Sequence, residues 1–371
     1  YYGPVDGHDL RRLEYMLRLV KDCKRPVLLH VITQKGKGYR PAELNPDVFH
    51  GIGCFDPSDG HTPQNAPLPG FSDTFGRVIC ELADKEPRLC AISAAMIRGT
   101  GLAEFRKAYP ARCFDVGIAE GHAVAMAGGL AKQGMLPVVA IYSTFLQRAY
   151  DMILQDVSML DLHVVFAVDR AGLVGEDGET HHGLFDVNYL RSVPNMQVLC
   201  PANQAELELM LRHAILEMKG PVAVRYPRGC DGAYTQPAAS PILRAGRDIT
   251  LVSYGTLINQ VLRAAELLEK QGISAEVLKL PSIKPIDFSV IRTSARKTGH
   301  LLVAEEAVCI GCAGKEIAGM LRTEGMNPVI RLCNAGDRFV PQGAVSDLYR
   351  LLGLDAESLA KTALEVLDHE A

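Results

Sequence analysis

Residues 115–122 (DVGIAEGH) place a carboxylate, Glu120, where a short strand pattern ends and a helix of small residues begins. A glutamate in the first turn of a helix commonly compensates the helix dipole, and for an isolated residue this interpretation is favoured. The alternative is a carboxylate that hydrogen-bonds a heterocyclic cofactor, because open α/β sheets bind ligands at the carboxyl ends of their strands. The residue types alone leave both interpretations open.

An aromatic residue stands at the next strand-to-helix junction, within residues 141–151 (IYSTFLQRAYD). Phe145 could stack on a flat cofactor ring, or it could pack in the core like any other phenylalanine. Arg148 follows three residues later and could reach a carboxylate or hydroxyl group of a substrate. The segment therefore offers an aromatic surface and a cation at one junction.

Residues 169–183 (DRAGLVGEDGETHHG) form a glycine-rich loop with many titratable groups after an apolar strand pattern. Loops at strand ends often carry function, whereas the simpler alternative is a solvated loop. Asp177, His181 and His182 could bind a metal ion, but their spacing matches no specific zinc pattern. Arg228, in residues 225–229 (RYPRG), lies between a strand and a glycine turn, where it could hold a phosphate or simply face solvent.

Short apolar runs alternate with amphipathic helical patterns over most of the chain, which is typical of parallel α/β sheets. The strand patterns lie at 89–92, 137–142, 164–168 and 222–226, and then at 249–253, 275–278, 301–304 and 329–332. The helical patterns include 119–132, 145–159, 204–218, 258–271 and 357–367. Ser72 is positioned to cap an earlier helix. We therefore expect two successive parallel-sheet α/β domains, at 64–232 and 233–371, with a linker at 236–241.

The first 63 residues differ from the rest. They contain one helical pattern at 10–22, one strand pattern at 26–33 and then a stretch rich in glycine and proline. One helix and one strand cannot bury a core alone. We interpret residues 1–63 as the tail of a third domain followed by a linker, and we expect the chain to be the C-terminal part of a longer protein.

The composition is that of an ordinary globular protein, with 371 residues, 48% hydrophobic and 22% charged. The net charge of -4 gives no reason to expect a nucleic acid or an anionic membrane as partner. No apolar run has the length of a membrane span and no leader pattern is present, so we expect a cytoplasmic protein. Ten scattered cysteines fit reduced thiols, and Cys309 and Cys312 form a lone CxxC without a second ligand pair.

Residues 115–122 and 141–151 together resemble the pyrimidine-binding domain of transketolase-like thiamine-diphosphate enzymes, and most closely the 1-deoxy-D-xylulose-5-phosphate synthase family. The resemblance implies that Glu120 protonates a ring nitrogen of the aminopyrimidine, with His122 beside it as a further catalytic residue. It also implies that Phe145 is the pyrimidine platform and that Ile118 contacts the cofactor. Gly121 stands where the family more often has glutamine, which leaves the functional side chains in place.

Further residues of the chain match substrate positions of this family. The resemblance implies that Arg170 and Arg228 hold the phosphate of the aldehyde substrate, with help from Tyr142. Asp177 and His181 match positions that contact pyruvate or the reacting intermediate.

The beginning of the chain also matches the family. Residues 2–9, 33–39 and 49–50 resemble the end of the diphosphate-binding domain, where the histidine corresponding to His8 faces the substrate; without the resemblance, His8 is an ordinary histidine near a helix start. Arg148 is expected at a substrate carboxylate or hydroxyl, and His182 has no assigned role. Residues 305–306 and 339–343 also match and are interpreted as structural.

The resemblance implies an enzyme, a transferase that joins pyruvate to D-glyceraldehyde 3-phosphate with loss of CO₂ and forms 1-deoxy-D-xylulose 5-phosphate for isoprenoid, thiamine and pyridoxal synthesis. Its cofactors would be thiamine diphosphate and Mg²⁺, and the enzyme would be a homodimer. The family holds the metal and the diphosphate through a Gly-Asp-Gly motif and a downstream asparagine, which we expect before Tyr1. We therefore expect no metal ligands in this chain, and a chain that is inactive alone.

Three rival interpretations remain. A transketolase, or the β-subunit of a 2-oxoacid dehydrogenase, would share the pyrimidine-binding pattern, and such a β-subunit naturally lacks a diphosphate-binding domain. The position of His8 and residues 33–39 (TQKGKGY) argue against a free β-subunit. A non-catalytic scaffold protein is disfavoured because the expected active-site residues of the pyrimidine domain are all present.

Overall fold

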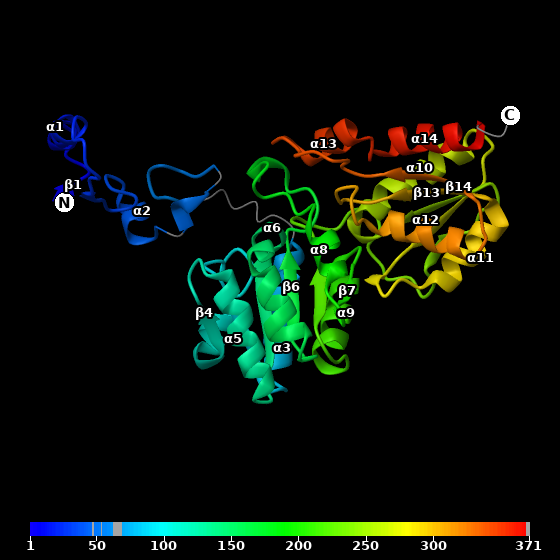
Figure 1. Ribbon diagram of the computed structural model, residues 1–371, viewed down its shortest axis with the longest axis horizontal. Coiled ribbons are helices and arrows are strands. Elements are labelled where there is room, and N and C mark those ends of the chain that lie inside the picture. The colour runs from blue at the N-terminus through cyan, green and yellow to red at the C-terminus, as the bar shows by residue number, and fades with distance from the viewer. Residues whose placement is uncertain (47, 53, 62–68, 369–371) are drawn as a thin grey trace. The chain divides into compact units, whose positions relative to one another are not determined.

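The computed structural model describes residues 1–46, 48–52, 54–61 and 69–368 (Figure 1). The chain divides into two compact units, Tyr1–Leu68 and Pro69–Ala371. Each unit is described by itself below.

The first unit contains little structure that encloses a core. Its elements are β1 (Tyr2–Asp6), α1 (Leu10–Val20), β2 (Leu29–Ile32), α2 (Arg40–Leu44) and a 3₁₀ turn (Val48–His50). β1 and β2 pair in parallel, and the Asp9 side chain caps α1 by accepting a hydrogen bond from the Arg12 amide. Among the described residues of this unit only Val5 and Ala42 are buried. The sequence predicted the helix and β2 but not β1.

The second unit begins with a seven-stranded sheet of order β12-β7-β8-β6-β5-β3-β4. Its strands are β3 (Leu89–Ser93), β4 (Cys113–Asp115), β5 (Leu136–Tyr142), β6 (Val165–Asp169), β7 (Gln197–Leu199), β8 (Val222–Arg225) and β12 (Ser282–Lys284). All neighbours are parallel except β12, which runs antiparallel to β7. Every residue of β3, β6 and β8 is buried, as expected for strands covered on both faces.

Helices cover this sheet on both sides. They are α3 (Phe71–Ala83), α4 (Ala103–Ala108), α5 (Glu120–Lys132), α8 (Asp186–Ser192) and α9 (Gln204–Leu216). The predicted cap at Ser72 is wrong. Gly70 occupies the cap position, its amide donates to the Asp73 carboxylate, and the Ser72 hydroxyl lies inside the helix and donates to Asp169 Oδ2 at 2.7 Å.

The predicted continuous helix at 145–159 is also wrong. The chain there divides into α6 (Ser143–Leu146), a 3₁₀ turn (Gln147–Ala149), α7 (Tyr150–Met152) and a π-helical stretch (Ile153–Ser158). This stretch packs tightly on α5, because a Cβ on Gly128 would lie only 2.7 Å from the Asp156 carbonyl oxygen. Its backbone shape therefore depends on contact with α5, which residue periodicity does not report.

The second sheet has five strands in the order β14-β13-β10-β11-β9. They are β9 (Ile242–Arg244), β10 (Ile249–Ser253), β11 (Ala275–Lys279), β13 (His300–Ala304) and β14 (Val329–Cys333). Only β9 is antiparallel to its neighbour. The helices around this sheet are α10 (Ile258–Glu269), α11 (Phe288–Thr298), α12 (Ala313–Thr323), α13 (Val345–Leu352) and α14 (Ala356–Asp368). The expected α/β class is confirmed, although each sheet is mixed through one antiparallel edge strand.

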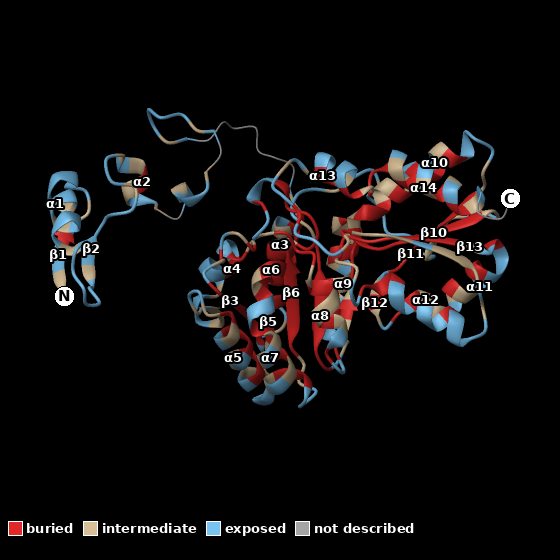
Figure 2. Ribbon diagram, turned by 45° about the horizontal axis from the view of Figure 1, so that its top comes forward, coloured by how far each residue is buried: buried red, intermediate tan, exposed pale blue. Residues whose placement is uncertain are grey.

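The two sheets share a hydrophobic core. β12 follows β11 along the chain but joins the first sheet beside β7. Leu278 and Ile283, from the second half of the unit, belong to the same buried cluster as Val198 and Cys200 of the first half. Figure 2 shows the buried strands of both sheets. The two α/β parts therefore form one unit, in which the orientation of each sheet depends on the other.

A pair of adjacent glycines on α5 tests how closely this helix is packed. Gly128→Ala should destabilise the chain by about 1–3 kcal/mol, because the added methyl group collides with the Asp156 carbonyl. Gly129→Ala is the matched control, since nothing lies within 4 Å of its added Cβ, and it should stabilise the chain by about 0.5–1 kcal/mol. Scanning calorimetry should show shifts of Tm in opposite directions; equal shifts would contradict the packing.

Candidate active site

The predicted site residues of the second unit gather at one edge of the seven-stranded sheet. Parallel strands end at the same edge, and the segments that follow β4, β5, β6 and β8 carry these side chains. The strand order β8-β6-β5-β3-β4 arranges them in sequence along the edge. Arg228 follows β8, Arg170 follows β6, Tyr142 and Phe145 stand at the end of β5, and Glu120 follows β4.

Glu120 is the first residue of α5 and is only 4% exposed. Its Oε1 accepts a hydrogen bond of 2.7 Å from Nη1 of Arg148, whose side chain is 53% exposed. The amino end of the helix also favours a negative charge at this position. Ile118, in the turn before the helix, is 80% exposed, and His122 is exposed as well. A buried carboxylate thus stands beside an exposed apolar side chain.

Phe145 lies at the centre of a set of ring contacts. Its ring stacks on Tyr142 at a centroid distance of 5.9 Å and meets the edge of His181 at 5.2 Å. The Arg148 guanidinium carbon lies 5.1 Å from the same ring centroid. The predicted aromatic platform is therefore a partly buried ring with a cation and an imidazole around it.

Two arginines form a cationic cluster beside Tyr142. The Arg170 guanidinium lies over the Tyr142 ring, 3.7 Å from its centroid, and Arg228 donates to Asp177 Oδ2 at 2.8 Å. The same Asp177 oxygen lies 3.9 Å from Arg170 Nε. Burial, together with the positive charge of Arg228, lowers the pKa of Arg170 to about 10.

Arg170 is held with unused hydrogen-bonding capacity. Its Nε and Nη1 atoms are buried and make no hydrogen bond to any described residue. Its backbone adopts the left-handed conformation with φ +57°, which is uncommon for a non-glycine residue. Gly99 makes room for this arrangement, since a Cβ there would lie 1.8 Å from the Tyr142 hydroxyl oxygen. Buried, unsatisfied cationic donors are suited to bind an anion.

Asp169 is a feature of this cluster that the sequence analysis did not identify. It is fully buried at the end of β6, where Oδ2 accepts from Ser72 and Oδ1 has no partner among the described residues. Burial raises the pKa of this carboxyl group to about 7, although Ser72, the Arg170 amide and Arg228 act in the opposite direction. A charged residue at the end of an otherwise apolar strand was the signal available in the sequence.

His8 belongs to the first unit. Its Nε2 accepts a 2.7 Å hydrogen bond from the Gln34 amide, and it stands one residue before the Asp9 cap of α1.

Eight of the predicted residues lie in one continuous chain of contacts within the second unit: Glu120, Arg148, Phe145, His181, Tyr142, Arg170, Asp177 and Arg228.

Two other kinds of site, a metal site and a redox-active cysteine pair, find no support among the described residues. Within the described ranges, no group of three His, Cys, Asp or Glu side chains is placed to hold a metal ion. Burial raises the pKa of Cys312 to about 12, which leaves little thiolate for redox chemistry. No helix in the described part of the chain has both the length and the apolar character of a membrane span.

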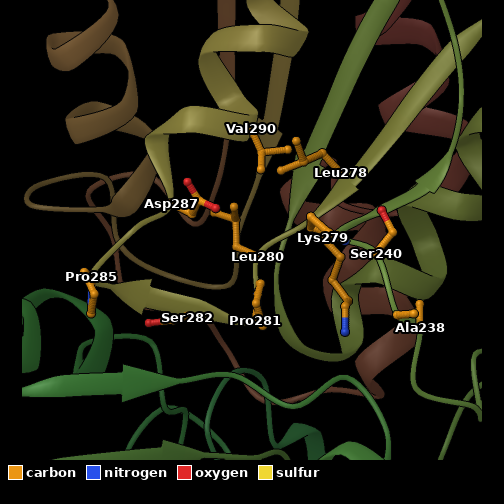
Figure 3. Close-up of a pocket in the computed structure, with 12 residues that line it drawn as sticks. Ala238, Ser240, Leu278, Lys279, Leu280, Pro281, Ser282, Pro285, Asp287 and Val290 are labelled. Atoms are coloured by element: carbon orange, nitrogen blue, oxygen red, sulfur yellow. The ribbon is translucent and has the colours of Figure 1, made fainter.

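A separate cavity of about 280 Å³ lies between residues 238–241, residues 278–282 and the start of α11 (Figure 3). The charged groups on its wall already have partners. Lys279 Nζ contacts Glu206, and the Asp287 carboxylate caps α11 through Ser289. The cavity therefore offers no free charged group that would select a ligand.

Comparison with known proteins identifies the family of the chain. Residues 69–230 match the transketolase pyrimidine-binding domain and residues 239–359 match the transketolase C-terminal domain. Residues 1–33 match the family described as 1-deoxy-D-xylulose-5-phosphate synthase. The chain belongs to the 1-deoxy-D-xylulose-5-phosphate synthase family.

Relatives within this family are similar over nearly the whole chain. The 1-deoxy-D-xylulose-5-phosphate synthase of Heliobacterium modesticaldum is 45% identical over 376 residues, which cover 99% of this chain and 58% of that protein. The protein of the same name from Thermomicrobium roseum is 47% identical, covering 99% and 59%. A solved structure described as a split gene transketolase, inactive β4 tetramer, is 30% identical with a TM-score of 0.71, covering 80% of this chain and 98% of that one. The chain thus spans less than two thirds of the length of these curated relatives.

The site fits part of the cofactor that a 1-deoxy-D-xylulose-5-phosphate synthase would use. An aminopyrimidine needs a carboxylate for its ring nitrogen and an apolar or aromatic surface for its faces. Glu120 supplies a buried carboxylate, Ile118 an exposed apolar side chain and Phe145 an aromatic ring. The described residues thus suit the pyrimidine of thiamine diphosphate.

The buried Asp169 predicts a pH-dependent contribution to stability. A carboxyl group whose pKa rises from about 4 unfolded to about 7 folded binds protons more tightly in the native state, so native stability falls as pH rises through this window. Asp169→Asn removes this loss. Its Tm advantage over the unmodified chain should therefore be larger at pH 8 than at pH 5.

The matched control for this measurement is Asp347→Asn, because the Asp347 side chain is 61% exposed. The raised pKa of Asp169 predicts that the Tm difference of Asp169→Asn depends more strongly on pH than the Tm difference of this control. If the Tm difference of Asp169→Asn depended no more on pH than that of the control, Asp169 would not titrate with a raised pKa.

Proposed function

We propose that the chain supplies the pyrimidine-binding and aldehyde-binding side of a 1-deoxy-D-xylulose-5-phosphate synthase. The reaction joins pyruvate to D-glyceraldehyde 3-phosphate with loss of CO₂, and its product would feed isoprenoid, thiamine and pyridoxal synthesis. The observation that carries the proposal is the line of contacts from the buried Glu120 carboxylate to the Arg170 and Arg228 pair. One end of this line suits a pyrimidine and the other suits a phosphate.

At the cofactor end, Glu120 would hold a proton at the pyrimidine ring nitrogen, with Ile118 and Phe145 against the ring and His122 nearby on the same helix. Thiamine diphosphate, when bound, supplies the carbanion chemistry that the side chains of the protein lack. Mg²⁺ is part of the proposal, with its ligands and those of the diphosphate outside the described residues. We therefore infer that the chain alone is inactive.

At the substrate end, Arg170, Arg228 and Tyr142 would bind the phosphate of the aldehyde. An anion already occupies this cluster in the form of the Asp177 carboxylate, which supports the choice of an anionic ligand. The buried Nε and Nη1 atoms of Arg170 can donate to phosphate oxygens without losing a hydrogen bond to any described residue. His181 and Arg148, which both contact the Phe145 ring, would face pyruvate. His8 is proposed as a further catalytic residue that faces the substrate.

A transketolase is the second candidate, because the similar solved structure is a split gene transketolase. Its 30% identity is lower than the 42–47% identity to proteins named 1-deoxy-D-xylulose-5-phosphate synthase. Residues 1–33 also match the synthase family rather than transketolase. We propose in addition that the working enzyme is a cytoplasmic homodimer, which sedimentation of the intact enzyme would test.

The deciding experiment joins the chain to a complete diphosphate-binding domain and measures 1-deoxy-D-xylulose 5-phosphate formed from pyruvate and D-glyceraldehyde 3-phosphate. Glu120→Gln in that enzyme should retain the fold and lower turnover roughly 10²–10³-fold, because it removes the charge opposite the pyrimidine nitrogen. Glu43→Gln, in the first unit, is the control and should leave turnover unchanged. Turnover near that of the unmodified enzyme in Glu120→Gln would refute the role of this carboxylate.

Arg228→Ala in the same enzyme should raise KM for D-glyceraldehyde 3-phosphate about 10- to 100-fold, the loss expected for one charged hydrogen bond. KM for pyruvate should change little, because pyruvate has no phosphate. Arg263→Ala, which removes an arginine that is 64% exposed on α10, is the matched control. An equal loss for both substrates would mean that Arg228 does not hold the phosphate.

A further inference from the structure

The loop that carries Asp177 and His181 is closed on itself at its base. Gly172 and Gly183 exchange two backbone hydrogen bonds of 2.8 and 2.7 Å. Residues 172–183 are called the substrate loop below. On the side of the first sheet, the Thr144 hydroxyl donates to the Thr180 carbonyl at 3.0 Å, and His181 meets the Phe145 ring. The substrate loop therefore covers the beginning of α6.

The opposite side of the substrate loop is held by the second half of the unit. His182 is 2% exposed, and its two ring nitrogens contact different segments. Nδ1 accepts from the Val174 amide at 3.2 Å, while Nε2 lies 3.1 Å from the Pro341 carbonyl oxygen. Both partners are satisfied only by a neutral imidazole with its hydrogen on Nε2. The His182 side chain thus connects both ends of the substrate loop, at Val174 and at His182 itself, to Pro341 in the segment before α13.

Two further contacts act at the same place. Glu306 is buried and its Oε1 accepts from the Leu173 amide at 3.0 Å. This approach requires Gly172, since a Cβ there would lie 2.7 Å from the same oxygen. The Gly343 amide also donates to the Gly175 carbonyl at 3.5 Å. Figure 1 shows the green substrate loop beside α13.

We propose that His182 is a positioning residue that holds the substrate loop on the second half of the unit and thereby orients Asp177 and His181. This inference rests on the proposed function, in which His181 faces pyruvate and Asp177 lies beside the phosphate-binding arginines. His181 and His182 are adjacent, and their rings meet different partners, Phe145 for the first and Pro341 for the second. Fixing the His182 ring therefore fixes the backbone from which the His181 ring projects.

The contacts of His182 argue against the other roles open to a buried histidine. Both ring nitrogens face backbone groups, so neither is free to bind a metal ion or to transfer a proton to a substrate. A purely structural histidine would affect the stability of the whole chain. A positioning residue affects the substrate loop selectively, and this difference can be measured.

The test is hydrogen exchange of the substrate-loop amides in the 371-residue chain, which requires no cofactor and no turnover. His182→Leu should raise the exchange rate of the substrate-loop amides about ten-fold, because the hydrogen bonds of His182 to Val174 and Pro341 are lost. His182→Gln should restore slow exchange, since the amide side chain can accept from Val174 and donate to Pro341.

The matched control is His163→Leu. His163 also contacts two backbone carbonyls, Gly220 at 3.0 Å and Ile215 at 3.3 Å, but it precedes β6 at the opposite end of that strand. This variant should leave the substrate loop unchanged. Unchanged loop exchange in His182→Leu, or an equal rise in His163→Leu, would overturn the proposal. If His182→Leu does not fold, His182→Asn, which is too short to reach both partners, replaces it with the same criteria.

A second measurement separates this inference from the proposed function. In the enzyme joined to a diphosphate-binding domain, His182→Leu should lower kcat with both substrates saturating, and His182→Gln should recover it. If loop exchange rises as expected but the unmodified enzyme forms no product, the proposed function fails while the loop contact stands. If the unmodified enzyme is active and kcat is unchanged in His182→Leu, the positioning role is refuted.

Discussion

The parallel alignment of β4, β3, β5, β6 and β8 is the constraint on which the rest of the site depends. A sheet whose faces are both buried leaves only the ends of its strands for function, and parallel strands bring their carboxyl ends to one edge. The strand order and direction then place the buried carboxylate, the aromatic pair and the two arginines along one edge. A strand inserted in the opposite direction would send its following loop to the other edge, so the chemistry requires this topology.

Burial of this sheet also leaves polar groups at its edge without hydrogen bonds to the described residues. Arg170 has a left-handed backbone, and within the described part of the chain two of its donors and one Asp169 oxygen make no hydrogen bond. A buried polar group without a hydrogen bond and a strained backbone each cost free energy. The pKa values of Arg170 and Asp169 move in the directions that burial dictates, downward for the arginine and upward for the aspartate. The surrounding sheet holds these side chains in place, so the proposed phosphate would require little reorganisation of the protein on binding.

Sequence patterns predicted the elements that depend on local properties. Apolar runs such as 249–253 are strands with those bounds, and Glu120 and Phe145 lie after strand ends at the sheet edge, where the strand patterns placed them. The patterns failed where another segment decides the outcome. The helix expected over 145–159 is reshaped by contact with α5, and β12 pairs with a strand about eighty residues earlier. The partners of His182, Asp169 and Glu306 likewise lie on segments that no local pattern connects.

The second half of the unit matters to the site because its orientation is fixed by buried charges. Lys279 at the end of β11 pairs with Glu206 of α9, and both side chains are 5% exposed. Arg225 at the end of β8 pairs with Asp186 at 2.7 Å, and its guanidinium faces the Tyr254 ring of the second half. A shifted interface would leave one charge buried without its partner, which costs more than a lost apolar contact. The Lys279–Glu206 pair and the contact between Arg225 and Tyr254 cross between the two halves, so they favour one arrangement of the two sheets. That arrangement places Pro341 and Glu306 where the substrate loop can meet them.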